Sequence, residues 1–400
     1  MTITVDRKKL VAGLRILLPG LPKNSTIPLL NYVEIDMINS ETLCLRANDL
    51  DMEITHVLSA EGERMKALAP ARSLLSRLAA MWDKTVTIDM VADHRIQVSG
   101  TDSQTTFRLM TLPDGFPGAE VPPEDCETVV TIEFAEAQFH GLFGAVATAI
   151  STQETRYYLN GVCLSPGDTT GEVRATATNG HRLESRTASV HIMGQIVGQP
   201  IIPRAAVAAM LATPENIEMR FELLTSPPKG SHIAYARLTA GQTCVATKLI
   251  DGTFPDWRRV VPALSNNTLE VDARALVRAL RIGTAGASKH SACVALISKD
   301  SELIIRGRRE GEEFESFVDA SMGGAVPTAA INPFLLTPAL GGYRGKVKLH
   351  ITDSGSPMRI SDGLGKAITV VMPMRLPEDV SVWPALRGGD LAPSKVKRAA

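Results

Sequence analysis

The sequence has few aromatic residues, no excess of either charge and no cysteine pattern. Aromatic residues are only 4% of the 400, which argues against a surface that stacks successive nucleic-acid bases. Forty-two Lys and Arg balance 43 Asp and Glu, so the chain does not coat nucleic acid by bulk charge, although a local basic surface remains open. The five cysteines form no C-x-x-C pair, which excludes a disulfide framework or zinc knuckle and suits a reducing cytoplasm.

Long apolar runs are also missing. No uncharged apolar run reaches the ~18 residues that a membrane-spanning helix needs. Arg7, Lys8 and Lys9 precede apolar residues as in a secretion signal, but Arg15 interrupts them and no small-x-small cleavage site follows. We interpret this segment as an amphipathic helix and predict a cytoplasmic protein with no membrane partner.

No set of residues with catalytic spacing is present. The eight histidines are dispersed, and the closest pair, His181 and His191, shows no metal-ligand pattern. The segment Gly363–Lys366 fails as a phosphate-binding loop, because Ile360 and Ala367 stand where glycine and Ser or Thr are required. Carboxylate pairs such as Asp49 and Asp51 are more often solvated loop residues than acid–base catalysts. We therefore predict no enzyme, no metal and no cofactor.

One unit instead occurs three times. Helical apolar spacing recurs over residues 6–18, 133–150 and 272–282, each with an acidic residue near its start and alternating strands after it. A second helix with proline in its first turn recurs over 70–82, 203–213 and 332–340. Because the copies are about 130 residues apart, they are domains with their own cores rather than solenoid repeats. The sequence predicts an α+β protein with domains at 1–123, 124–262 and 263–376, followed by a flexible extension at 377–400.

Charge is sorted between the predicted helices and the rest of the chain. The six helical ranges hold ten Lys or Arg and four Asp or Glu, a net charge of +6, so the remainder carries −7. Arg274, Arg278 and Arg281 share one helical face. Each helix taken alone can be an ordinary solvated surface. Alternatively, several basic faces converge on one polyanion and follow its phosphates without reading sequence.

Four segments, and a similar fifth in the first repeat, resemble the bacterial DNA polymerase III beta subunit family, the sliding clamps. They are Arg156–Gly161, Thr178–Leu183, Phe254–Val260 and Val370–Leu376, with Asn48–Glu53 as the fifth. The resemblance runs from residue 1 to about 376. It implies the DNA-clamp fold, with two helices on antiparallel sheets in each domain and a ring-shaped head-to-tail homodimer. It implies no chemistry, since such a ring tethers polymerases to duplex DNA.

The resemblance also implies three sets of site residues. The DNA contacts are Lys23, Arg72, Gln153, Tyr157, Tyr158 and Arg204, although Asn24 stands where the family often has Arg. The partner-peptide pocket is formed by Leu159, Thr178, Gly180, Arg182, Leu183, Pro255, Arg259, Val260, Val370, Met372, Pro373, Met374 and Arg375. The dimer edge is formed by Phe107 and Leu109. The implied partners are double-stranded DNA, a second copy of the chain, the DNA polymerase III alpha subunit, the clamp loader and other proteins with clamp-binding motifs.

Alternatives remain for several of these assignments. One of the two tyrosines can simply be half-buried, and Val370–Met372 can be only a core strand, because alternate residues of a strand face opposite ways. The chain also departs from the family, which usually ends near Leu376, by an extension with Trp383 and a basic end. The segment Gly283–Gly286 has only small side chains, whereas bulky apolar residues would seal a dimer edge. These departures leave open a clamp-fold accessory or resistance variant that binds partner peptides without being the main replicative clamp.

Overall fold

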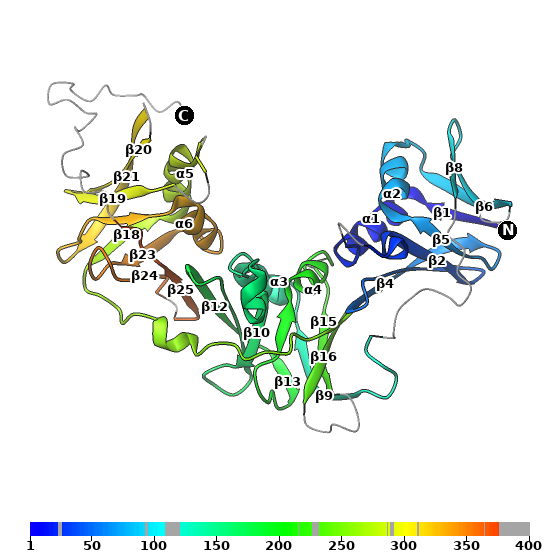
Figure 1. Cartoon of the computed structure of the whole chain (residues 1–400), viewed down its shortest axis with the longest axis horizontal. Coiled ribbons are helices and arrows are strands. Elements are labelled where there is room, and N and C mark those ends of the chain that lie inside the picture. Colours follow the sequence, from blue (N-terminus) through cyan, green and yellow to red (C-terminus); the bar gives the residue numbers. More distant parts are fainter. Residues whose placement is uncertain are drawn as a thin grey trace. The chain divides into compact units, whose positions relative to one another are not determined.

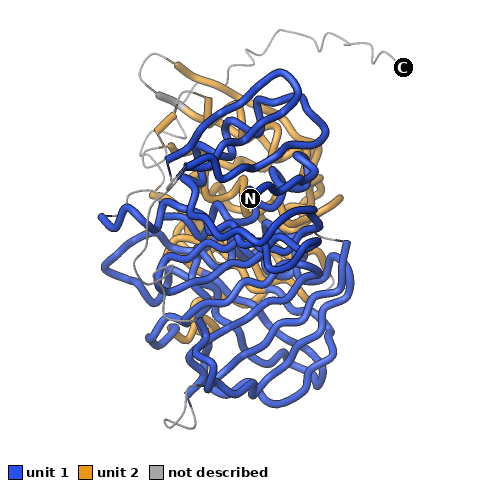
Figure 2. Tube along the Cα trace, turned by 90° about the vertical axis from the view of Figure 1, so that its right-hand side faces the viewer, with its two compact units in different colours: residues 1–177, 186–254 blue, residues 178–185, 255–400 orange. Residues whose placement is uncertain are grey.

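The structure is a computed structural model that describes the chain except residues 23–25, 93–94, 109–120, 215, 226–231, 286, 289–291, 310–311, 364 and 376–400. The chain divides into two compact units (Figure 2). Unit 1 contains Met1–Ala177 and Arg186–Phe254. Unit 2 contains Thr178–Ser185 and the described residues from Pro255 onward.

The first third of the chain has two helices and eight strands (Figure 1). Asp6 caps the first helix, because its carboxylate accepts a hydrogen bond from the Lys9 backbone N–H at 3.0 Å. The elements are β1 (Thr2–Asp6), α1 (Arg7–Leu17), the 3₁₀ turns η1 (Leu18–Gly20) and η2 (Pro28–Asn31), β2 (Tyr32–Asn39), β3 (Thr42–Asn48), β4 (Met52–Gly62), β5 (Lys66–Pro70), α2 (Ala71–Ala80), β6 (Thr85–Ala92), β7 (Arg95–Ser99) and β8 (Gln104–Arg108).

The middle third repeats this order with one added strand, β13. Its first helix begins later than the sequence predicts, because Glu133 and Phe134 continue a strand and Ala137 adopts a left-handed conformation with φ 63°. The elements are β9 (Glu127–Phe134), α3 (Gln138–Ala147), η3 (Glu154–Leu159), β10 (Gly161–Pro166), β11 (Glu172–Thr178), β12 (Arg182–Ser189), β13 (His191–Gly194), β14 (Ile201–Pro203), α4 (Arg204–Met210), β15 (Met219–Thr225), β16 (Ile233–Ala240), β17 (Thr243–Lys248) and η4 (Trp257–Val260).

The last third again has two helices and eight strands, and side chains of Asp272 and Asn332 cap the two helices. The elements are β18 (Thr268–Asp272), α5 (Ala273–Thr284), β19 (Val294–Lys299), β20 (Glu302–Arg309), β21 (Glu312–Gly323), β22 (Ala329–Ile331), α6 (Pro333–Leu340), β23 (Lys346–His350), β24 (Met358–Ser361) and β25 (Ala367–Val371). All six predicted helices are confirmed. Pro333 lies in the first turn of α6, whereas Pro70 and Pro203 stand one position earlier, as the N-cap residues of α2 and α4.

The strands form antiparallel sheets in both units. In unit 1 the strand order is β13-β9-β15-β16-β17-β4-β1-β6-β7-β8, so β17 of the second repeat pairs directly with β4 of the first. In unit 2 the strand order is β12-β25-β24-β23-β18-β21-β20-β19-β22, and only the start of β12 belongs to this unit. The first two repeats share one hydrophobic core and the third has its own, so the compact units are fewer than the three repeats.

The two helices of each repeat lie side by side. α1 packs beside α2, α3 beside α4 and α5 beside α6 (Figure 1). Leu10, Leu14 and Leu17 of α1 are buried against the sheet, while Lys8 and Arg15 are exposed. The same division holds in α5, where Leu276 and Leu280 are buried while Arg274 and Arg278 are exposed.

Candidate nucleic-acid interface and docking groove

The six helices carry charge of one sign only. They contain ten Lys or Arg residues and no Asp or Glu. The four acidic residues of the predicted ranges lie outside them: Asp6 and Asp272 are N-caps, Glu133 belongs to β9 and Glu136 precedes α3. The sorting of charge is therefore sharper than the sequence predicts.

Nine of these ten basic residues are exposed. The tenth, Arg7, is half-buried and donates hydrogen bonds to the carbonyl oxygens of Asp83 and Leu78, at 2.6 and 3.1 Å, so it fastens α1 to the end of α2. An exposed set of cations without acidic neighbours on the same helices suits the binding of phosphates.

Two of the residues assigned to DNA lie at helix starts. Arg72 and Arg204 are exposed in the first turns of α2 and α4. Arg72 also donates from Nη2 to the Leu21 carbonyl oxygen at 3.0 Å, which holds the side chain across η1. Lys23, and Asn24 beside it, lie outside the described residues.

The other three lie at η3, with Gln153 as its N-cap residue and Tyr157 and Tyr158 within it, and they differ in exposure. Tyr157 is 54% exposed, whereas Tyr158 is half-buried, and their rings meet edge to face with centroids 5.8 Å apart. Gln153 is exposed, and its Oε1 accepts a hydrogen bond from Arg156 Nε at 2.9 Å. Tyr157 is therefore the more accessible of the two rings, and the half-buried alternative applies to Tyr158.

A tight turn, which we call the second turn (Thr178–Arg182), shapes the candidate docking groove. The Asn179 side chain accepts hydrogen bonds from the backbone N–H groups of His181 and Arg182, at 3.0 and 2.9 Å. The Asn179 N–H donates to the Arg182 carbonyl oxygen at 3.2 Å. Gly180 has φ 87°, a left-handed conformation that glycine adopts at no steric cost.

Hydrogen bonds join the second turn to the end of β25 and to α6. The Met372 N–H donates to the His181 carbonyl oxygen at 2.9 Å, and the Met374 N–H donates to that of Ala330 at 2.8 Å. Arg182 is 3% exposed and donates from Nη1 to the Leu335 carbonyl oxygen at 3.2 Å. The start of α6 therefore contacts Arg182 of the predicted pocket. This contact could not be predicted from the sequence, because the two residues are 153 positions apart and no motif marks it.

We call the exposed and half-buried members of the predicted pocket in unit 2 the partner groove. They are Thr178, Gly180, Pro255, Arg259, Val260, Met372, Pro373, Met374 and Arg375. Arg182, Leu183 and Val370 are buried in unit 2, and Leu159 is buried in unit 1. Val370 thus has the core position that the alternation of strand side chains allows, while Met372 is 37% and Val260 54% exposed. Arg259 forms an ion pair with Asp256 at 2.9 Å.

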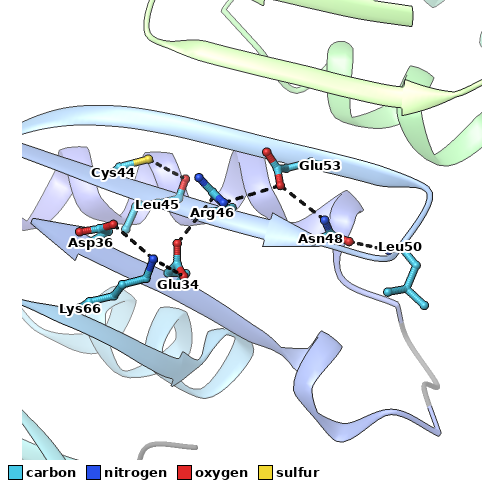
Figure 3. A network of polar contacts seen from close by, with 9 residues as sticks. All are labelled: Glu34, Asp36, Cys44, Leu45, Arg46, Asn48, Leu50, Glu53 and Lys66. Atoms are coloured by element: carbon cyan, nitrogen blue, oxygen red, sulfur yellow. Dashed lines mark hydrogen bonds and ion pairs between the residues drawn. The ribbon is translucent and has the colours of Figure 1, made fainter. Parts of the chain in front are cut away.

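The first repeat contains the same turn with different side chains, and we call it the first turn (Asn48–Met52; Figure 3). The Asp49 carboxylate accepts from the N–H groups of Asp51 and Met52, at 3.1 and 2.7 Å. Leu50, with φ 82°, stands where the second turn has Gly180, and its side chain projects away from the hairpin (Figure 3). The Lys248 N–H donates to the Asp51 carbonyl oxygen at 2.8 Å, as Met372 does to His181.

The residues assigned to the dimer edge are only partly described. Phe107 lies on β8, the last strand in the unit 1 order, but its side chain is buried in the core at 5% exposure, whereas Thr106 and Arg108 are exposed. Leu109 lies outside the described residues. In unit 2, α5 and β21 line a hollow of about 560 Å³, with Arg278, Ile282 and Phe317 among its residues.

The described part of the chain contains no group of three or more His, Cys, Asp or Glu side chains placed to hold an ion. Among the same residues, no helix combines the length and apolar composition needed to cross a lipid bilayer.

Comparison with known proteins gives matches over most of the chain. Residues 1–119 match the family model for the N-terminal domain of the DNA polymerase III beta subunit, and residues 133–256 match that for its central domain. The beta sliding clamps of Pseudomonas putida and Escherichia coli are 28% and 27% identical, each covering 94% of this chain and 100% of the relative. A crystal structure of the Pseudomonas aeruginosa sliding clamp bound to griselimycin superposes with a TM-score of 0.78 at 26% identity, again over 94% and 100% of the two chains.

Proposed function

Because this chain belongs to the DNA polymerase III beta subunit family, the non-catalytic sliding clamps that give polymerases processivity, we propose that it encircles duplex DNA as a head-to-tail homodimer. In this proposal, residues 1–123, 124–262 and 263–376 are three clamp domains of one protomer. The observation that carries the proposal is a strand-pairing rule that the chain follows twice.

The rule joins the last strand of one repeat to the fourth strand of the repeat before it. β17 pairs with β4 in unit 1, and β25 lies next to β12 in unit 2. β8, the last strand of the first repeat, ends the described sheet order, and β21 is the fourth strand of the third repeat. Two copies that applied the rule to each other's β8 and β21 would close a ring of two protomers.

The part of β21 that would take part in this third junction follows from the repeats. Ala60 pairs with Val5 in the first repeat and Ala320 with Val271 in the third, so Met52–His56 of β4 corresponds to residues 312–316 of β21. In this proposal β8 lies along that stretch, which begins with Glu312 and Glu313. With Phe107 buried, backbone hydrogen bonds and the exposed side chains of β8 would make the contact, next to the hollow between α5 and β21.

DNA binding in this proposal depends on the basic helices and on closure. Arg72, Gln153, Tyr157, Tyr158 and Arg204 contact DNA, and the exposed helix cations follow its phosphates in any sequence. Such contacts are individually weak and sensitive to salt. A closed ring stays on DNA without strong adhesion, because it leaves only over an end.

The partner groove binds short peptides of the DNA polymerase III alpha subunit, the clamp loader and other proteins with clamp-binding motifs. Flexible methionines next to exposed Val260 suit several apolar side chains, and Arg375 and Arg259 orient acidic or backbone groups of the peptide. The buried Arg182 holds the groove in shape through Leu335. The place of action is the cytoplasm.

Retention on DNA of two topologies tests the proposal. Clamps loaded onto nicked circular DNA should survive a high-salt wash, whereas those on the same DNA after linearisation should be lost over the ends. Thr106→Pro removes a backbone donor from the exposed β8 edge and should abolish retention, while Thr106→Val should keep it. Equal loss from circular and linear DNA would refute encirclement.

The extension beyond residue 376 keeps a second function open, that of an accessory clamp that binds partner peptides without supporting replication. Stimulation of DNA synthesis by the cognate polymerase separates the two. A main clamp stimulates synthesis on long primed templates, and an accessory clamp binds the polymerase peptide without doing so.

A further inference from the structure

Resting on the partner groove proposed above, we propose that residues 378–386 of the same chain dock into that groove and compete with partner peptides. The described part of the chain ends at Arg375, directly after the groove residues Met372, Pro373 and Met374. The following segment therefore starts at the groove itself. No long path is needed to bring it there.

The segment has the chemistry that the groove accepts. Glu378 and Asp379 precede the apolar residues Val380, Val382, Trp383 and Leu386. The groove residues include the exposed cations Arg375 and Arg259 and the exposed apolar side chains Val260 and Met372, which are 54% and 37% exposed. Two carboxylates followed by spaced apolar side chains thus complement cations next to an apolar surface.

Part of this chain has no counterpart in two of its relatives. The Pseudomonas putida and Escherichia coli clamps are matched over their whole length by 94% of this chain, which leaves 6% of it unmatched.

Covalent attachment makes a weak contact effective. Trp383 is eight residues beyond Arg375, which is a reach of at most about 28 Å for an extended chain. A short tether of this kind gives an effective concentration on the order of 1 mM. An intrinsic dissociation constant of about 0.2 mM would then weaken a partner's apparent affinity about sixfold.

Peptide binding to three forms of the full-length fold tests this contact. A fluorescent peptide carrying the clamp-binding motif of the cognate polymerase alpha subunit is titrated with the full chain, with a chain ending at Leu376 and with Trp383→Ala. We expect the truncated chain to bind the peptide three- to tenfold more tightly than the full chain, and Trp383→Ala to recover most of that gain. Trp82→Ala is the matched control, because Trp82 is 97% exposed on unit 1 and should change nothing.

A second titration separates failure of this contact from failure of the groove. An unlabelled peptide of residues 376–388 should displace the polymerase peptide from the truncated chain, and Met372→Glu should weaken both. If the polymerase peptide binds but truncation and the 376–388 peptide have no effect, the tail contact is refuted and the groove stands. If the polymerase peptide does not bind the truncated chain, the groove itself is refuted.

Two further outcomes would contradict docking within one chain. An inhibition that grows with protein concentration would mean that the segment docks on a second copy. A truncation that alters only retention on DNA would assign the extension, with Lys395, Lys397 and Arg398, to phosphate contacts instead.

Discussion

The first and second turns have the same backbone hydrogen-bonding pattern but different side chains. Each places an Asn or Asp side chain under two successive backbone N–H groups, and each receives an N–H from a strand of the next repeat. Leu50 of the first turn is equivalent in position to Gly180 of the second, and Met52 is equivalent to Arg182. One scaffold can therefore serve as a plain junction at the first turn and as a peptide groove at the second, and the side chains alone make the difference.

The largest effect is expected from replacing the buried last residue of the first turn, Met52, by the residue found at that position in the second turn, arginine. Met52 is 2% exposed in the apolar core of unit 1, whereas Arg182 has the Leu335 carbonyl as an acceptor. Met52→Arg buries a cation among apolar groups and should lower the free energy of unfolding by about 3 kcal/mol or more, measured by urea denaturation. Met52→Leu, the control, should cost less than about 1.5 kcal/mol. Equal midpoints for the two variants would contradict this difference between the turns.

The next effect concerns the left-handed residue. Gly180→Leu adds a side chain at φ 87° and should cost roughly 1–2 kcal/mol in urea denaturation while also blocking peptide binding. Gly180→Ala carries most of the backbone cost without the bulk, so it should retain more binding. Leu50→Gly relieves the same strain in the first turn and should not destabilise the protein. A loss of stability in Leu50→Gly as large as that in Gly180→Leu would show that the Leu50 side chain stabilises unit 1.

A smaller effect is expected from the side chain beneath each turn. Asn179→Ala removes two hydrogen bonds and should cost about 1–2 kcal/mol. Asp49→Asn keeps the same acceptor oxygen. Burial raises the pKa of Asp49, so folding disfavours its charged form, and stability is lost as the pH rises through the carboxyl's titration. Asp49→Asn should therefore match or exceed the wild-type stability at pH 7, and urea denaturation showing a clear loss would contradict this.

The smallest effect is a pH dependence specific to the first junction. His56 on β4 accepts or donates a 2.9 Å hydrogen bond with Thr243 on β17, and burial lowers its pKa. Because the unfolded chain binds this proton more readily, the free energy of unfolding should fall as the pH drops below about 6.5. His56→Gln should flatten the part of the fall that lies above the carboxyl range. An unchanged profile in thermal melts from pH 7.5 to 5.5 would rule out His56 as its source.

Local patterns predict local structure well in this chain. The spacing of apolar residues and the recurrence of a proline-led second helix located all six helices, and the acidic residues near two helix starts, Asp6 and Asp272, are N-caps in the structure. The start of α3 was wrong, because Glu133 and Phe134 have the right spacing for either a helix or a strand, and pairing with β15 decides for β9. The net positive charge of the helices was underestimated because the predicted ranges were too long. Two of the four acidic residues counted in them are N-caps, and the other two precede α3.

Contacts between distant segments could not be read from the sequence. The bond from Arg182 to Leu335 and the pairing of β17 with β4 depend on tertiary packing that no local pattern encodes. Phe107 points inward because of the register of β8. In a strand of only five residues, the alternation of apolar and polar side chains does not determine that register. The family resemblance supplied the pocket residues, and the structure divides them into a buried base and an exposed surface.

Sedimentation equilibrium over a concentration series tests the third junction, and with it ring closure, most directly. The account predicts a species of about 86 kDa, twice the 42.9 kDa chain, that gives way to monomer when Thr106→Pro disrupts the β8 edge. A 42.9 kDa monomer that persists at every concentration would contradict it.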